Sequence, residues 1–198
     1  MSIHLNLQHV NFDDYKSFQL IKKLKKMATT KWSIDPTHSE IHFKVKHLMI
    51  TTVTGSFGEF SGEATTEGDD FEGASINFTA QIASITTNNE QRDGHLKSAD
   101  FFDAETHPTL TFVGKELKNG TLTGELSMHG ITKEVTLNAD FLGVAKDPWG
   151  NTKAGFELEG KIKRSDFGLT WNAPTEAGGV LVSDDVRLLA NVQLVKAA

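Results

Sequence analysis

The chain has 198 residues, no cysteine and a formal charge of −6 at pH 7. This length fits a single domain with a short extension. The lack of cysteine excludes disulfides, thiolate catalysis and cysteine-based zinc sites. No run of about 18 apolar residues is present, so the sequence predicts no transmembrane helix.

The first 30 residues differ from the rest in charge. Residues 1–26 hold five lysines and two aspartates, a net charge of +3, which leaves −9 on the remaining 172 residues. An acidic body is a poor partner for a phosphate backbone, so we expect no nucleic-acid binding. Phe18, Ile21 and Leu24 recur at helical spacing against a lysine-rich face. We expect a poorly ordered basic extension or a short helix over residues 1–30, with peripheral membrane contact as its functional alternative.

The extension lacks the marks of a secretory signal. Its lysines follow its apolar residues instead of preceding them. It also lacks an apolar run of about 7–15 residues ahead of a small-residue cleavage site. We therefore expect a cytoplasmic protein.

From residue 31 onward, apolar and polar residues alternate with the period of a half-buried strand. This pattern predicts about nine strands, eight of which can close a barrel. They lie near Trp32–Ile34, Ile41–Lys46, Ser56–Ala64, Ala74–Ile82, Leu110–Phe112, Leu122–Met128, Val135–Phe141, Phe156–Lys163 and Val186–Leu194. Turn-forming residues such as Asn119-Gly120 separate them.

One segment has a helical pattern. Asn88–Ser98 begins with residues that cap helices, although Gly94 weakens it. It lies in a long connection over residues 83–109. Long amphipathic strands favour a closed barrel over an open sandwich, because closure removes exposed edges. The predicted fold class is therefore all-β, an eight-stranded antiparallel barrel over residues 31–198 with one short helix in a long connection.

The inward face of such a barrel determines whether its lumen is filled. Here the inward positions mix phenylalanines with small residues, which leave volume that bulky residues would fill. These small residues are Ala74, Ala80, Gly124, Ala139, Gly160 and Ala190. The apolar face carries almost no charge, so an open lumen would suit a long apolar ligand. The candidate lumen residues are Phe43, Val45, Phe57, Ile76, Phe78, Ala80, Phe112, Leu126, Met128, Phe141, Phe156, Leu158, Phe167, Trp171, Leu188 and Ala190. A packed core without a cavity is the structural alternative.

Several segments are specific when taken together and in order. They are Trp32–Ser39, Ile41–Leu48, Arg92–Leu96, Asp100–Ala104, His107-Pro108, Met128–Lys133 and Arg164–Leu169. Over about residues 31–196 the chain resembles the YceI-like family of lipocalin-like polyisoprenoid-binding proteins. The resemblance implies an extended lipocalin-like barrel whose lumen holds a polyisoprenoid, such as a polyprenyl quinone, or a fatty-acid-like lipid, with no required cofactor. It also implies a homodimer, and a periplasmic location as the alternative to a cytoplasmic one.

Two charged clusters each have a functional and a structural interpretation. Arg92, Asp93 and His95 either form a polar rim that meets a ligand head group or tie the long connection to the barrel. Arg164 and Asp166 either belong to that rim or form an ion pair that fixes a strand end.

Two further interpretations concern Trp171 and the histidines. Trp171 either lines the barrel mouth or fills the core. His38 and His42 share one face of a strand but lack a positioned carboxylate, so we expect no metal site.

No nucleophile elbow, phosphate loop or dinucleotide fingerprint is present, and no catalytic residue is predicted. The expected function is therefore that of a lipid-binding protein that sequesters or carries a long-chain isoprenoid. An enzyme acting on isoprenoid or quinone-type substrates and a packed interaction module without ligand are the alternatives.

Overall fold

The structure is a computed structural model, and it describes residues 29–174 and 179–197. The strands are β1 (Thr29–Ile34), β2 (Glu40–His47), β3 (Thr51–Phe57), β4 (Phe60–Glu67), β5 (Asp70–Gln81), β6 (Ile85–Thr86), β7 (Thr109–Lys118), β8 (Thr121–Met128), β9 (Ile131–Lys146), β10 (Thr152–Lys163) and β11 (Val182–Lys196). One α-helix, α2 (Glu90–Lys97), and two 3-10 helices, η1 (Ile82–Ser84) and η2 (Arg164–Phe167), complete the described elements. None of these helices is long and apolar enough to span a bilayer.

The basic extension expected over residues 1–30 lies outside the described residues except for its last two positions. Thr29 and Thr30 already belong to β1, where they pair with Glu67 and Thr66 of β4. The described barrel therefore begins two residues before the boundary expected at residue 31.

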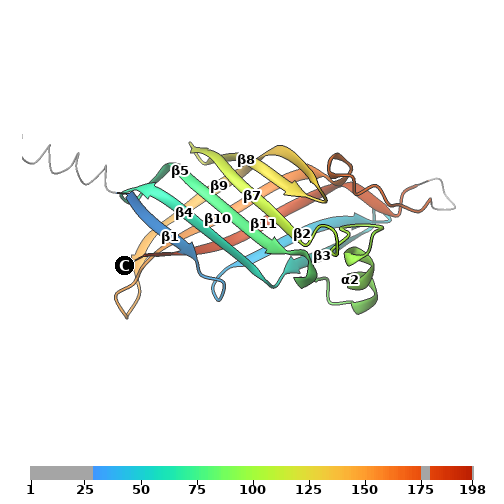
Figure 1. The fold of residues 1–198 in the computed structure, drawn as a ribbon, viewed down its shortest axis with the longest axis horizontal. Coiled ribbons are helices and arrows are strands. Elements are labelled where there is room, and N and C mark those ends of the chain that lie inside the picture. The colour runs from blue at the N-terminus through green and yellow to red at the C-terminus, as the bar shows by residue number, and fades with distance from the viewer. Residues whose placement is uncertain (1–28, 175–178, 198) are drawn as a thin grey trace, which may run out of the picture.

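β1 closes the barrel. It pairs with β4 on one side, where Trp32 lies opposite Ala64, and with β11 on the other, where Trp32 lies opposite Lys196. Strands β1, β4, β5, β7, β8, β9, β10 and β11 thereby form a ring in which every pairing is antiparallel (Figure 1). The predicted eight-stranded antiparallel barrel is confirmed.

Strands β2, β3 and β6 extend the wall beyond this ring. The C-terminal end of β11 pairs with β1, whereas its N-terminal part pairs with β2, with Ala190 opposite Ile41. The loop of residues 35–39 separates the two short strands that share β11. β2 then pairs with β3, and β3 with β6. Figure 1 shows α2 at this end of the barrel and the C-terminus at the other.

The strand expected over Ser56–Ala64 is wrong, because the chain turns between β3 and β4. At this turn, the Gly58 N–H donates to the Ser84 carbonyl at 3.2 Å. The Gln81 N–H donates to the Glu59 carbonyl at 2.9 Å. These two hydrogen bonds attach the turn to the segment around η1. β3 and β4 do not form a single strand, because β3 pairs with β2 and β6, whereas β4 pairs with β1 and β5.

The helical prediction over Asn88–Ser98 is confirmed, with narrower bounds. α2 follows Asn89, whose side-chain oxygen accepts a hydrogen bond from the Arg92 N–H at 2.9 Å. The segment Arg164–Leu169, interpreted as a strand end, instead starts as the 3-10 helix η2 and leaves it through Gly168 at φ 74°. Glycine takes this left-handed conformation without a steric penalty, which lets the chain change direction as it leaves η2.

Aromatic rings fill the barrel at the end that carries the C-terminus. Trp32 is fully buried, and its indole N–H donates to the Thr66 hydroxyl at 3.0 Å. Its ring centroid lies 5.0 Å from that of Phe71, which lies 4.9 Å from that of Phe156 in an edge-to-face arrangement. The Thr66 hydroxyl thus satisfies the one polar atom of the indole, and the aromatic cluster closes this end of the interior.

Candidate functional site: the barrel lumen

The alternation of each strand sends one set of side chains into the barrel. In the register, Leu188 of β11 lies between Phe43 of β2 and Gly160 of β10, so these residues share the inward face. Many inward side chains at mid-barrel are only half-buried, namely Ile76, Phe78, Leu110, Val135, Leu137, Leu158, Leu188 and Val192. An inward side chain stays accessible only when empty space adjoins it. The lumen is therefore not filled by its own lining.

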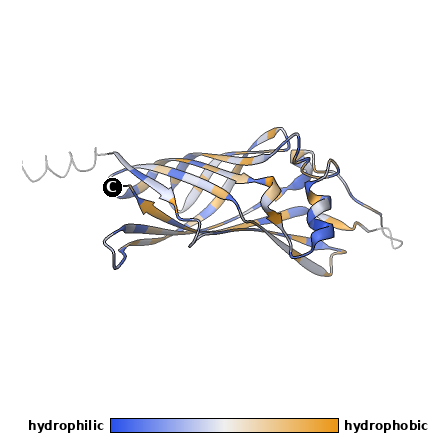
Figure 2. Ribbon diagram, turned by 60° about the horizontal axis from the view of Figure 1, so that its bottom comes forward, coloured by the Kyte–Doolittle hydropathy of each residue, from blue (hydrophilic) through white to orange (hydrophobic). Residues whose placement is uncertain are grey.

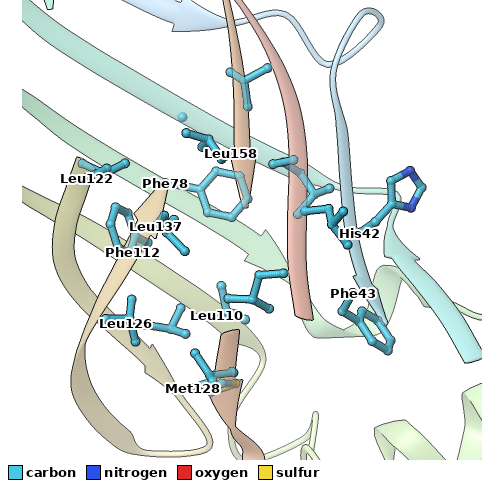
Figure 3. A pocket seen from close by; sticks show the side chains of 18 of the residues that line it. His42, Phe43, Phe78, Leu110, Phe112, Leu122, Leu126, Met128, Leu137 and Leu158 are labelled. Carbon is cyan, nitrogen blue, oxygen red and sulfur yellow. The ribbon is translucent and has the colours of Figure 1, made fainter. Parts of the chain in front are cut away.

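This space is an elongated cavity of about 250 Å³. Its lining runs from Phe71 and Leu122 at the aromatic end to Leu96 and Phe101 beside α2. Figure 3 shows side chains of β2, β5, β7, β8, β9 and β10 converging on it, while His42 extends to the other side of β2. The cavity weighs against the alternative of a packed core.

Small residues contribute to the cavity in two different ways. Ala139 and Ala190 line it directly. A Cβ atom on Gly124 would lie 2.4 Å from the Phe112 ring, and one on Gly160 would lie 2.3 Å from the Leu137 side chain. These two glycines therefore make room for larger neighbours in the wall, and the expectation that they leave open volume is wrong.

Most of the predicted lumen residues lie on the cavity. Those that line it are Phe43, Val45, Ile76, Phe78, Phe112, Leu126, Met128, Phe156, Leu158, Leu188 and Ala190. The other five do not. Phe57 and Ala80 pack with Ile82 and Ile85 in a separate cluster, and Phe167 is buried in the core outside the cavity.

Phe141 and Trp171 lie at opposite ends of the molecule. Phe141 is 50% exposed and contacts Phe71, whose ring centroid lies 5.5 Å away, beyond the end of the cavity. Trp171 is half-buried and packs against His95 and Phe101, at centroid distances of 4.7 Å and 5.2 Å. The Trp171 ring thus covers the connection that carries α2 and does not line the cavity.

Sequence reasoning missed two groups of lining residues. Leu110, Leu122, Val135, Leu137, Val186 and Val192 line the cavity. They have the same strand parity as residues that were predicted, so alternation alone identifies them. Leu96, Phe101 and Phe102 come from the non-periodic connection, where no sequence period marks the inward side.

Arg164 brings a buried charge to the cavity wall. It is 6% exposed, and its guanidinium donates to backbone carbonyls of Ser183 at 3.0 Å, Trp171 at 2.8 Å and Leu169. Burial lowers the pKa of Arg164, and the nearby Asp184 carboxylate opposes that effect. The expected ion pair at a strand end is corrected, because carbonyl groups hold this side chain. These hydrogen bonds join η2 to residues 169–171, which follow it, and to Ser183 of β11.

Asp166 and His95 do not join Arg164 in one cluster. Asp166 is exposed on η2. His95 forms a 3.0 Å contact with the exposed carboxylate of Asp100. The charged residues predicted as a rim therefore sit in separate local networks.

Arg92 and Asp93 both bind Thr87, which is buried at the start of the long connection. The Arg92 Nε–H donates to the Thr87 hydroxyl at 2.7 Å, and the Thr87 N–H donates to the Asp93 carboxylate at 2.7 Å. Burial by itself raises the pKa of Asp93, but hydrogen bonds from Thr87 and Thr86 and the charge of Lys97 outweigh it and lower that pKa. Arg92 and Asp93 therefore have a structural role, because their hydrogen bonds tie α2 to the end of strand β6 and the residue that follows it.

His38 and His42, the two histidines considered for a metal site, each contact a carboxylate. His38 contacts Asp35 at 3.0 Å, and His42 contacts Glu40 at 3.1 Å. The hydrogen bond from the Thr37 hydroxyl, helped by Lys153 and His38 against the effect of burial, holds the pKa of Asp35 well below its usual range. In the described part of the chain, no three His, Cys, Asp or Glu side chains gather closely enough to hold a metal ion.

Comparisons with known sequences match a YceI-like domain over residues 32–194. A UPF0312 protein of Staphylococcus epidermidis is 40% identical over 167 residues, which is 83% of this chain and 96% of that protein. A UPF0312 protein of Staphylococcus aureus is 38% identical over the same length and coverage.

Solved structures agree with the sequence matches. The Campylobacter jejuni YCEI protein is 36% identical, with a TM-score of 0.63 over 78% of this chain and 91% of that one. A polyisoprenoid binding domain from Saccharophagus degradans is 18% identical, with a TM-score of 0.59 over 84% and 98%, and shares the fold. The family suggested by the sequence segments is confirmed, and the chain belongs to the YceI-like family.

Proposed function

We propose that this protein sequesters or carries a long-chain amphiphile in its lumen, with an isoprenoid as the first candidate. The observation that carries the proposal is the apolar cavity of about 250 Å³ inside a closed barrel. Each CH₂ group moved from water into such a cavity contributes about 0.8 kcal/mol. A chain of several isoprene units therefore gains affinity without many polar contacts.

The shape of the barrel favours an extended chain over a compact ring system. β5 and β10 each have 12 residues, a length of roughly 40 Å at about 3.3 Å per residue. The cavity follows the long axis of the barrel between the aromatic end and α2. The Saccharophagus degradans domain of the same fold is a polyisoprenoid binding domain, which supports the isoprenoid class.

We propose a binding protein in preference to an enzyme. The cavity lining is mainly aliphatic and aromatic, and the buried guanidinium of Arg164 donates to backbone carbonyls that fix η2. An enzyme acting on isoprenoids or quinones predicts a chemically altered product when prenyl quinones or prenyl phosphates are incubated with the protein. Detection of such a product by mass spectrometry would overturn this choice.

The direct test is native mass spectrometry of the protein purified from its own host, followed by organic extraction. We expect an added mass that extraction removes and that fragments as a long-chain lipid. Titration of delipidated protein with a polyprenol and with a fatty acid of matched length then ranks the two ligand classes. If no lipid co-purifies and neither ligand binds, the carrier function is wrong. The same native spectra test the expected homodimer.

A further inference from the structure

The turn between β2 and β3 presents three consecutive large apolar side chains to solvent. Leu48, Met49 and Ile50 are 40%, 61% and 78% exposed. Val180, 48% exposed, lies beside them, because the Leu48 N–H donates to the Leu181 carbonyl at 2.8 Å. Scattered apolar side chains are ordinary on a protein surface, but a contiguous group marks an interaction site. We call Leu48, Met49, Ile50 and Val180 the apolar tip.

The backbone of the apolar tip is unusual for its sequence. Leu48 and Met49 have φ angles of 50° and 61°, in the left-handed region. Hairpin turns in which two consecutive residues have positive φ normally use Asn, Asp or Gly, since larger L-residues are disfavoured there. Asn119 and Gly120, in the β7–β8 turn, follow that rule with φ of 49° and 72°. Turn formation therefore does not explain Leu48 and Met49, whereas a role for their side chains does.

The hairpin that carries the apolar tip is basic on an acidic molecule. Residues 40–57, which form β2, the turn and β3, contain Lys44, Lys46 and one acidic residue, Glu40, at the end of β2 away from the turn, whereas the whole chain has a formal charge of −6. Both lysines have the parity opposite to Phe43 and Val45, which line the cavity, so they face outward. An anionic lipid surface attracts outward lysines of this kind next to an apolar insertion.

The apolar tip also adjoins one end of the lumen. Val182, opposite His47 in the register, lines the cavity, and Leu48 follows His47 directly. Figure 1 places this turn at the α2 end, and Figure 2 shows the same end in hydropathy colours. We propose that the apolar tip inserts into the surface of an anionic lipid membrane and docks the α2 end of the barrel there.

A membrane fits the apolar tip better than a second copy of this chain. A stable protein interface buries about 800 Å² on each partner, and a turn with four partly exposed side chains offers far less. Shallow insertion needs only a few apolar side chains and gives weak, reversible attachment unless a second signal is present. The lysines of β2 supply that second signal. This proposal stands without a loaded lumen, so it can fail or hold independently of the proposed carrier function.

The opposite end of the barrel supplies a matched control. Trp149, in the β9–β10 turn, is 84% exposed, and Leu142 on β9 is 63% exposed. Figure 1 shows this turn at the end that carries the C-terminus. General hydrophobic adsorption would involve Trp149 at least as strongly as Ile50, whereas oriented docking would not.

The experiment is co-sedimentation of the full chain with phosphatidylcholine vesicles, with and without phosphatidylglycerol. We expect wild type to sediment with phosphatidylglycerol vesicles and the double variant Met49→Ser/Ile50→Ser to bind at least about tenfold more weakly. Trp149→Ser should bind like wild type. Unchanged melting temperatures will show that the variants are folded, which the exposure of these positions favours.

Several outcomes would overturn the proposal. They include no sedimentation of wild type, equal binding by the double variant, and an equal loss in Trp149→Ser. A variant with Lys22, Lys23, Lys25 and Lys26 changed to Gln tests the basic extension. If that variant alone loses binding, the extension is the anchor. If the double variant instead turns a dimer into a monomer without changing sedimentation, a second copy covers the apolar tip.

Discussion

The imidazole of His95 and the indole of Trp171 lie edge to face, with ring centroids 4.7 Å apart and an interplanar angle of 86°. His95 belongs to α2, and Trp171 to the segment that follows η2. The contact therefore joins two connections that are far apart in sequence at the α2 end of the barrel. Phe101 packs against both rings, at 4.9 Å from His95 and 5.2 Å from Trp171.

A double-mutant cycle measures this contact. Edge-to-face aromatic pairs contribute about 0.5–1.5 kcal/mol beyond simple burial. We expect His95→Ala and Trp171→Ala to show a coupling energy in that range, because each variant removes the partner of the other. Hydrogen exchange of the α2 amides is the suitable measurement, since α2 has no buried residue and can open separately from the barrel. Strictly additive effects would show that the rings do not stabilise each other.

Asp93→Asn should destabilise α2 in a pH-dependent way. The Thr87 N–H and the Thr86 hydroxyl donate to the Asp93 carboxylate, and weakening these bonds to a buried segment costs about 1–3 kcal/mol. The pKa of Asp93 is lowered in the folded protein. Its contribution is therefore present above the unfolded pKa of about 4 and is lost as pH falls toward the folded pKa.

Urea unfolding and α2 hydrogen exchange at a series of pH values test this expectation. The difference between wild type and Asp93→Asn should be largest near neutral pH and narrow below about pH 4. Asp166→Asn is the control, because Asp166 is exposed, and it should change stability by less than about 0.5 kcal/mol. A gap that widens on acidification would contradict the assignment of Asp93.

Arg164→Gln should be strongly destabilising, in contrast to Arg187→Gln. Arg164 is 6% exposed and donates to several backbone carbonyls that lose their partner in the variant. We expect a loss of at least about 2 kcal/mol in the free energy of unfolding. Arg187 pairs with Glu159 on the surface, and its loss should cost about 0–1 kcal/mol. Equal effects in urea titrations would show that Arg164 does not hold η2.

The sequence predicted the elements whose apolar residues recur with a regular period, and it missed those that depend on a few individual hydrogen bonds. Alternation located the strands of the ring, and the cap at Asn89 located α2. The corner at Gly58 and Glu59 has no such signal, since it depends on hydrogen bonds to Ser84 and Gln81.

The site shows the same division. Inward residues on strands follow from parity, whereas Phe101 and Phe102 reach the cavity from an irregular connection. The charged residues of α2 and η2 have polar side chains typical of a ligand rim. Their hydrogen-bond partners, Thr87 for Arg92 and backbone carbonyls for Arg164, become visible only in three dimensions. The sequence therefore predicted the apolar lumen more reliably than it predicted the roles of single charged residues.

Gly94→Ala should stabilise α2. Gly94 lies inside the helix, and a Cβ atom added there meets nothing within 4 Å. Alanine is favoured over glycine in a helix interior by about 0.8–1.0 kcal/mol. Gly143, at φ 111° in the bulge of β9, is the opposite case, and Gly143→Ala should destabilise the barrel. Hydrogen exchange of α2 and urea unfolding of the barrel separate the two effects. A loss of protection in Gly94→Ala would be inconsistent with this geometry.

Filling the lumen should weaken ligand binding without unfolding the barrel. Ala190 lines the cavity and lies opposite Ile41 and Leu158, while its neighbour Asn191 points outward and is exposed. In Ala190→Trp, the indole takes up space that a long-chain ligand needs, so we expect at least about tenfold weaker binding of a fluorescent long-chain probe. Asn191→Trp adds the same indole to the outer face and should bind like wild type. Both variants must first show a cooperative melt, because overpacking costs about 1–3 kcal/mol. If Ala190→Trp folds and binds the probe as tightly as wild type, the ligand site is not the lumen.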